Sequence, residues 1–215
     1  MTWFIDHLGE VWDLGRQHAV LAGLPLLLGL LIALPLGWLA RRFRWLYAPF
    51  TAGFGLLYTI PSLALFVILP LVTGRGILDP FNVIVAMTLY TVALLVRTVA
   101  DGLGSVPGAV TNAATAMGYT PGKRFFAVEL PLAVPVISAG LRVAAVSNVS
   151  IVSVGTVIGV QQLGLFFSDG FNRQFYDPII VGIVACIVLA LIFDAVILVV
   201  TRLLTPWLRA TGARA

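Results

Sequence analysis

The sequence predicts an all-α integral membrane domain of five helices, from its high apolar content, its low charge and the length of its apolar runs. Of its 215 residues, 60% are hydrophobic and 10% are charged, and the mean hydropathy is +1.05. Soluble domains contain about 25% charged residues. This composition excludes a soluble globular domain, a disordered chain and a disulfide-rich secreted scaffold. The single cysteine, Cys186, lies in an apolar run and is expected to be a small buried hydrophobe.

Five apolar runs are each long enough to cross about 30 Å of hydrocarbon at about 1.5 Å per residue. They cover residues 18–40, 47–72, 81–99, 132–160 and 178–203. Pro61 and Pro70 lie inside the second run and predict kinks, because proline removes a backbone hydrogen bond. The sequence therefore divides into an extracytoplasmic segment 1–17, a transmembrane domain 18–203 with a cytoplasmic loop 101–131, and a cytoplasmic tail 204–215.

The distribution of basic residues predicts the orientation of these spans. Most of the basic residues fall on one side: Arg41, Arg42, Arg44, Lys123, Arg124, Arg202, Arg209 and Arg214. The other side carries Arg16, Arg75 and Arg173 among several acidic residues. Since cytoplasmic loops are enriched in Lys and Arg, the first side is expected to be cytoplasmic. The N-terminus is then outside and the C-terminus inside, in a multi-pass protein of the cell membrane. The net charge of +4 therefore reflects topology, and no nucleic-acid partner is expected.

The loop 101–131 contains signals for two short helices. Ser105 is a candidate N-cap with Pro107 in the first turn, and Gly118 is placed to end the first helix in a left-handed conformation. Thr120 and Pro121 then form an N-cap followed by proline at the first helical position. Two short helices that meet at a glycine predict a compact projection on the inner face of the membrane.

This projection resembles the EAA loop of the permeases of ABC importers. In that loop two alanines precede a glycine, and a Leu-Pro pair follows about a dozen residues later. Here Ala113-Ala114, Gly118 and Leu130-Pro131 stand at that spacing, while Asn112 replaces the usual glutamate. The resemblance implies a five-helix transmembrane domain of the type I importer class. It further implies that the loop is a coupling helix, which docks on an ATPase subunit.

Three further segments resemble the osmoprotectant branch of this family, whose cargoes are glycine betaine, carnitine, choline or similar quaternary-ammonium solutes. They are Thr59-Ile-Pro-Ser-Leu-Ala-Leu65, the run from Glu129 to Arg142, and the run from Ile158 to Gly164. In the last segment Val160-Gln161-Gln162 replaces small residues. The resemblance implies two ATP-binding subunits, a second permease (a copy or a sibling), and an extracytoplasmic substrate-binding protein. The sequence contains no phosphate-binding P-loop, so ATP and Mg²⁺ are expected on the partner subunits.

Polar residues within the spans are the candidates for function. Arg142 and Asp194 lie at similar predicted depth and are a candidate charge pair, structural or functional. Candidates for a translocation path or gate, or simply for helix packing, are Tyr58, Pro61, Ser62, Ser147, Asn148 and Ser150. His7 and His18 are expected at the outer interface. No catalytic residue and no metal site is expected.

Three alternatives stay open at this point. The first is a permease of the same superfamily for an amino acid, for instance methionine. The second is a solute or ion channel without an ATPase, in which the coupling-like loop would have no role. The third is a membrane scaffold, in which the polar residues of the fourth span would serve packing only.

Overall fold

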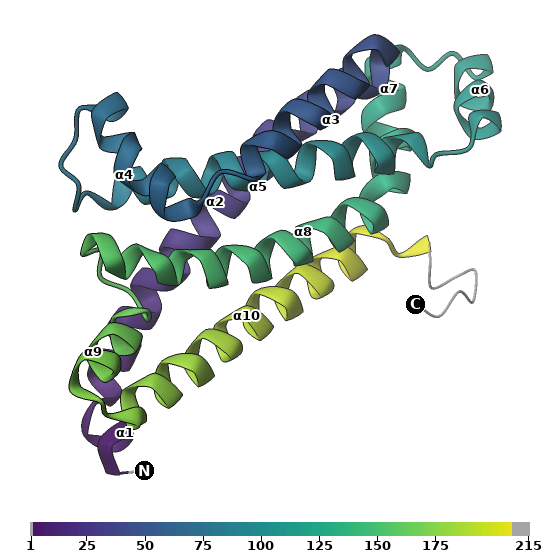
Figure 1. Cartoon of the computed structure of the whole chain (residues 1–215). Coiled ribbons are helices and arrows are strands. Elements are labelled where there is room, and N and C mark those ends of the chain that lie inside the picture. Colours follow the sequence, from purple (N-terminus) through teal and green to yellow (C-terminus); the bar gives the residue numbers. More distant parts are fainter. Residues whose placement is uncertain (1, 208–215) are drawn as a thin grey trace.

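The computed structural model describes residues 2–207, and its regular elements are all helices (Figure 1). The elements in chain order are α1 (Thr2–Asp6), α2 (Leu8–Arg42), α3 (Arg44–Tyr58), α4 (Ser62–Thr73), α5 (Pro80–Gly104), α6 (Gly108–Ala116), α7 (Pro121–Arg124), the π-helix η1 (Phe125–Glu129), α8 (Leu130–Val152), the 3₁₀ helix η2 (Ser153–Ile158), α9 (Leu165–Arg173) and α10 (Tyr176–Leu204).

The predicted all-α membrane fold is confirmed, but the bounds of its spans differ from the prediction. Four helical segments of the described chain are long and apolar enough to cross a membrane: 8–42, 80–104, 121–158 and 176–204. The fifth candidate is α3 followed by α4, which bend by 99° across a short break. The chain therefore has four straight candidate spans and one broken span.

The break replaces the kinks expected in the second span. It lies at residues 59–61, where Pro61 has an extended backbone (ψ 131°) and cannot continue the helix. Pro70 lies inside α4 without ending it. The first helix also differs, since it begins at Leu8 rather than His18 and runs for 35 residues. Residues 8–17, expected as part of a separate segment, are thus continuous with the first apolar helix.

Helix α5 forms the centre of the bundle. It packs against α2, α3 and α8, and its apolar core residues include Leu95, Val96, Val99 and Leu103, each at most 1% exposed. Helix α10 packs on α8 and α9, and many of its apolar side chains are exposed. A bundle with a buried apolar centre and an apolar exterior is the arrangement that lipid requires, since helices satisfy their backbone groups internally.

Two glycines let α2 and α5 approach each other closely. A Cβ on Gly37 would lie 2.6 Å from Val99 Cγ1 and 2.9 Å from the carbonyl oxygen of Val96. A Cβ on Gly29 would meet the side chain of Thr91. Small residues at such crossings bring two backbones into contact, which is the main source of attraction between helices in lipid.

A buried amide connects the same two helices to α8. Asn148 is 2% exposed, and its Nδ2 donates to the carbonyl oxygen of Ala22 at 3.2 Å and to Thr91 Oγ1 at 2.9 Å. The Thr91 hydroxyl also bonds the Met87 carbonyl oxygen at 2.8 Å. The amide thus joins α2, α5 and α8 at one point.

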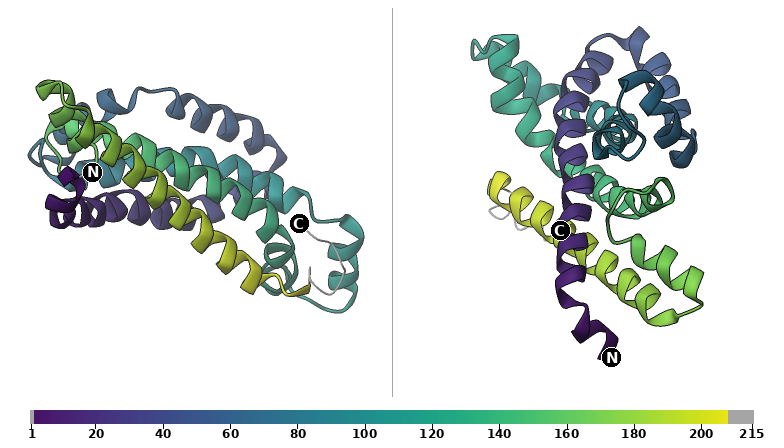
Figure 2. Two further views of the ribbon diagram at one scale, coloured as in Figure 1. Left: turned by 90° about the horizontal axis from the view of Figure 1, so that it is seen from below. Right: turned by 90° about the vertical axis from the view of Figure 1, so that its left-hand side faces the viewer.

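The bundle has two distinct ends. Helices α6 and α7 project from one end, and α1 and α9 lie at the other, in both the first view and the view from below (Figures 1 and 2). The long helices connect the two ends, so the N-terminal helix and the projecting loop are far apart.

The close crossing of α2 and α5 predicts that Gly37→Ala destabilises the protein. The added methyl would overlap Val99, and we expect a loss of about 1–3 kcal/mol, the usual cost of overpacking. Thermal unfolding of the purified protein in detergent measures this loss as a lower melting temperature.

Gly53→Ala in α3 is the matched control, because a Cβ there meets no atom within 4 Å. It should leave the melting temperature unchanged or slightly raised, since alanine is the better helix former. Equal melting temperatures for the two variants would contradict the close approach at Gly37.

Candidate functional site

The projecting loop begins two residues later than the caps of the sequence suggest. Ser105 has an α-helical backbone (φ −74°, ψ −14°) and ends α5, and its Oγ donates to the Gly102 carbonyl oxygen at 2.7 Å. An N-cap residue needs an extended backbone, so the expectation that Ser105 caps α6 is wrong. Pro107, with ψ 134°, occupies that position and α6 starts at Gly108.

The turn between the two short helices forms as expected. Gly118 has φ +82°, and the amide of Tyr119 donates to the carbonyl oxygen of Ala114 at 3.1 Å. Glycine adopts this left-handed conformation without the steric cost of a Cβ. Thr120 then caps α7, its Oγ1 accepting from the Lys123 amide at 3.4 Å, with Pro121 at the first helical position.

Helix α6 presents most of its surface outward. Ala114 is 2% exposed and faces the rest of the chain, whereas Asn112 and Ala113 are exposed. Leu130 and Pro131, at the start of α8, are half-buried. Exposed apolar side chains lie nearby on Val110, Met117 and Phe126. A small helix with an exposed apolar and small-residue surface is suited to contact another protein.

Arg142 and Asp194 form an ion pair between α8 and α10. Arg142 Nη2 donates to Asp194 Oδ2 at 2.9 Å, and Arg142 Nε donates to Asp194 Oδ1 at 2.5 Å. Two parallel bonds of this kind fix the orientation of both side chains. The side chains are 41% and 23% exposed, so the pair lies on the side of the bundle and not in its core.

The path candidates fall into two groups. In α8, Asn148 has its amide engaged in the packing of three helices, while Ser147 is half-buried and Ser150 is exposed. At the break between α3 and α4, Tyr58 is 38% exposed and Pro61 is exposed. Tyr58 meets the ring of Tyr90 edge-on at 5.7 Å, and the Tyr90 hydroxyl donates to the carbonyl oxygen of Ile60 at 2.5 Å. Ser62 opens α4 and is half-buried.

His18 was expected at the outer interface, but its side chain is buried within the bundle and 0% exposed. Its Nε2 lies 2.9 Å from the carbonyl oxygen of Val149, and its Nδ1 lies 3.1 Å from Gln162 Oε1. Val149 is one of the last four residues of α8, whose carbonyls lack a full set of helical partners. His18 and Gln162 therefore satisfy a buried helix end. The sequence pattern assigned no role to Gln162, although Gln162 stands where the resembling segment of the family has a small residue. His7 is half-buried and bonds the Trp3 carbonyl oxygen.

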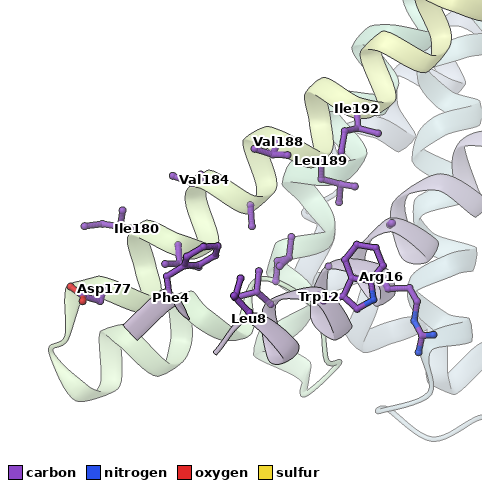
Figure 3. A pocket seen from close by; sticks show the side chains of 16 residues that line it. Phe4, Leu8, Trp12, Arg16, Asp177, Ile180, Val184, Val188, Leu189 and Ile192 are labelled. Atoms are coloured by element: carbon purple, nitrogen blue, oxygen red, sulfur yellow. The ribbon is translucent and has the colours of Figure 1, made fainter. Parts of the chain in front are cut away.

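A groove of about 850 Å³ lies between the first turns of α2 and the first half of α10 (Figure 3). Phe4, Leu8 and Trp12 line one side, and Ile180 and Val184 line the other. Its walls are almost entirely apolar, with Arg16 and Asp177 as the charged lining residues. None of the path candidates lines it. Among residues 2–207, no group of three His, Cys, Asp or Glu side chains is placed to hold a metal ion.

The apolar bundle and the helical loop at one end define a multi-pass membrane protein with a projecting loop. Residues 26–210 match the family of the binding-protein-dependent transport system inner membrane component. This chain belongs to that family, and it is a membrane permease subunit of an ABC importer.

Relatives of known name align with nearly the whole chain. The osmoprotectant import permease protein OsmW of Salmonella typhimurium is 34% identical, over 95% of this chain and 96% of the relative. The choline transport system permease protein OpuBD of Bacillus subtilis is 32% identical, over 100% of this chain and 94% of the relative. A solved structure of the MetNI methionine ABC transporter has a TM-score of 0.80 at 21% identity, over 91% and 96% of the two chains. That likeness establishes the fold of a type I importer transmembrane domain.

The ion pair between α8 and α10 predicts that Asp194→Asn lowers the melting temperature of the detergent-solubilised protein. The variant leaves the Arg142 guanidinium without its anion, and an unpaired charge beside hydrocarbon is costly. The double variant Arg142→Gln, Asp194→Asn removes both charges and should recover part of the loss. If Asp194→Asn melts like the wild type, the pair does not hold the two helices together.

Proposed function

We propose that this chain is the permease subunit of an ATP-driven importer for quaternary-ammonium osmoprotectants such as glycine betaine, carnitine or choline. The observation that carries the proposal is the end-to-end alignment with relatives named for these solutes, at 30–34% identity over at least 90% of this chain. The methionine transporter shares the fold at 21% identity. The fold therefore supports the importer class. The names of the relatives support quaternary-ammonium solutes, rather than methionine, as the cargo.

The proposed partners follow from what a permease subunit needs. Two ATP-binding subunits would carry ATP and Mg²⁺, because this sequence contains no P-loop. A substrate-binding protein would deliver solute on the outer side. A second permease, either a copy of this chain or a sibling, would complete the path, since five apolar segments are few to enclose one. Neither a channel without an ATPase nor a scaffold accounts for the family membership.

The proposed orientation puts the N-terminus outside and the C-terminus inside. In support, the basic residues Arg41, Lys123 and Arg124 share one end of the bundle: Arg41 lies beside Gly104 at the end of α5, from which the loop departs. The positive-inside rule makes this end cytoplasmic. The projecting loop would then face the cytoplasm, where ATPase subunits are found.

Helix α6 is the proposed contact with the ATPase subunits. Asn112 and Ala113 are exposed on it, Ala114 anchors it, and Gly118 sets the direction of the chain that follows. Leu130 and Pro131 begin the membrane helix α8 that receives this chain. Asn112 carries no charge, so the contact would depend on shape and apolar surface.

The proposed translocation path passes the break at residues 59–61. Tyr58 offers an exposed ring there, held against Tyr90, and aromatic faces attract quaternary-ammonium cations. Pro61 and Ser62 form the break itself, where backbone groups leave the helix. Ser147 and Ser150 on α8 are the other proposed lining residues, whereas Asn148 is engaged in packing.

The proposed docking role predicts that an ATPase co-elutes with the tagged protein from detergent-solubilised native membranes. Gly118→Pro should lose this partner, because proline cannot adopt the φ of +82° found at Gly118. The matched control is Gly122→Ala in the same loop, where a Cβ meets no atom within 4 Å. A wild-type chain that elutes without ATPase activity would overturn the proposed function.

The proposed cargo predicts that choline and carnitine compete with uptake of labelled glycine betaine, and that methionine does not. Tyr58→Ala should lower this uptake by about two- to thirtyfold, since a cation–π contact contributes about 0.5–2 kcal/mol. Tyr58→Phe keeps the ring and should retain uptake. Competition by methionine alone would assign the chain to the amino-acid class, and equal uptake by both Tyr58 variants would remove Tyr58 from the path.

A further inference from the structure

Helix α6 is attached to the rest of the chain by few contacts. It projects beyond the end of the bundle (Figures 1 and 2), and of its nine residues only Ala114 is buried. Apolar packing of one alanine methyl provides little stabilisation. A force applied to α6 by a partner would therefore rotate the helix about its ends unless another contact held it.

Arg124 supplies that contact. Its Nη1 donates to Thr115 Oγ1 on α6 at 2.9 Å, and its Nε donates to Glu129 Oε1 at 2.6 Å. The Thr115 hydroxyl donates in turn to the Thr111 carbonyl oxygen, one turn back along α6, at 2.9 Å. Of the hydrogen bonds that the Thr111 and Thr115 side chains make within residues 2–207, the bond from Arg124 is the one that connects α6 to another helix.

The residues of this link are suited to carry force. The Arg124 and Glu129 side chains are 27% and 16% exposed, so their ion pair is more shielded than a surface pair. A guanidinium has several donors in a rigid planar fork and can bond two partners in different directions. The neighbouring Lys123 points elsewhere, its Nζ lying 4.7 Å from the centre of the Tyr119 ring.

The link ends on a continuous helix that reaches the other end of the bundle. Helix α7, the π-helix η1, α8 and the 3₁₀ helix η2 form one helical segment over residues 121–158. Glu129 ends η1 directly before α8, and π-turns inside α-helices are frequent at functional sites. Beyond its midpoint, α8 is bonded through Asn148 to α2 and α5. A displacement at Glu129 is thus a displacement of a membrane helix.

We infer that Arg124 is a positioning residue, which fastens α6 to the root of α8 and passes the movement of α6 to the membrane helices. The inference rests on the proposed function, in which α6 docks on an ATPase subunit. It adds the residues that convert docking into transport: Thr115 receives the link on α6, and Glu129 anchors it on the membrane side.

Thr115→Val tests the link with little change of shape, since valine replaces the hydroxyl by a methyl. Thr111→Val is the matched control: the same substitution on the same helix, at a hydroxyl that bonds only the Gly108 carbonyl oxygen at 2.9 Å. Both are measured in the full complex with its ATPase subunits and binding protein, in proteoliposomes. The readouts are co-elution of the ATPase, the rate of ATP hydrolysis, and solute imported per ATP.

Thr115→Val should retain co-elution and ATP hydrolysis at the wild-type level. Its solute imported per ATP should fall on the order of tenfold, the size expected for a lost charge-assisted hydrogen bond. Arg124→Lys should lower the solute imported per ATP by a similar factor. Its ammonium keeps the charge near Glu129 but lacks the planar fork that reaches Thr115. Thr111→Val should match the wild type in all three readouts.

Three results would overturn the inference, and they are distinguishable. If Thr115→Val imports as much per ATP as Thr111→Val, the link does not transmit movement while the proposed function stands. If Thr115→Val alone loses the ATPase on elution, the link shapes the docking surface rather than passing on its motion. If the wild-type complex shows no ATP-dependent import, the proposed function fails, and the inference fails with it.

Discussion

The buried amide of Asn148 joins three helices through hydrogen bonds that lipid could not replace. Water can replace a lost hydrogen bond at the surface of a soluble protein, but hydrocarbon cannot, so polar groups in a membrane bundle must find partners inside it. Asn148 bonds the Ala22 carbonyl oxygen on α2 and Thr91 on α5. Its position depends on the close crossing of α2 and α5 at Gly29, where Thr91 already fills the space. The central helices are therefore held in one register.

The same rule explains a second polar centre, which lies beside Asn148 at the C-terminal end of α8. That helix ends inside the bundle, where its last carbonyl groups need donors. His18 from α2 lies against the Val149 carbonyl oxygen, and Gln162 Nε2 donates to the Ser153 carbonyl oxygen at 3.0 Å. Residues from three parts of the chain thus complete one helix end. With Asn148 one residue before Val149, α8 is held firmly to α2 over this stretch.

The two ends of α8 are held by different contacts. Its far half is fixed by Asn148 and by the cluster around His18, while its root continues through a π-turn into a loop attached by Arg124. The ion pair of Arg142 with Asp194 adds a contact to α10 between these regions. The C-terminal half of α8 is thus tied to α2 and α5, whereas its N-terminal end is tied to the loop.

The sequence by itself determined the class, the existence of the apolar helices and the two-helix form of the loop, because these depend on local rules. Apolar run length predicted the helices, and Gly118 and Thr120 predicted the turn from their own backbone preferences. Pro61 predicted an interruption of the second span, but tertiary structure decided its 99° angle, the burial of His18 and the bond from Arg124 to Thr115. Each of these depends on residues far apart in sequence or on the packing of separate helices. Hydropathy and capping patterns describe one segment at a time, and they carry no information on which side chains meet across a bundle.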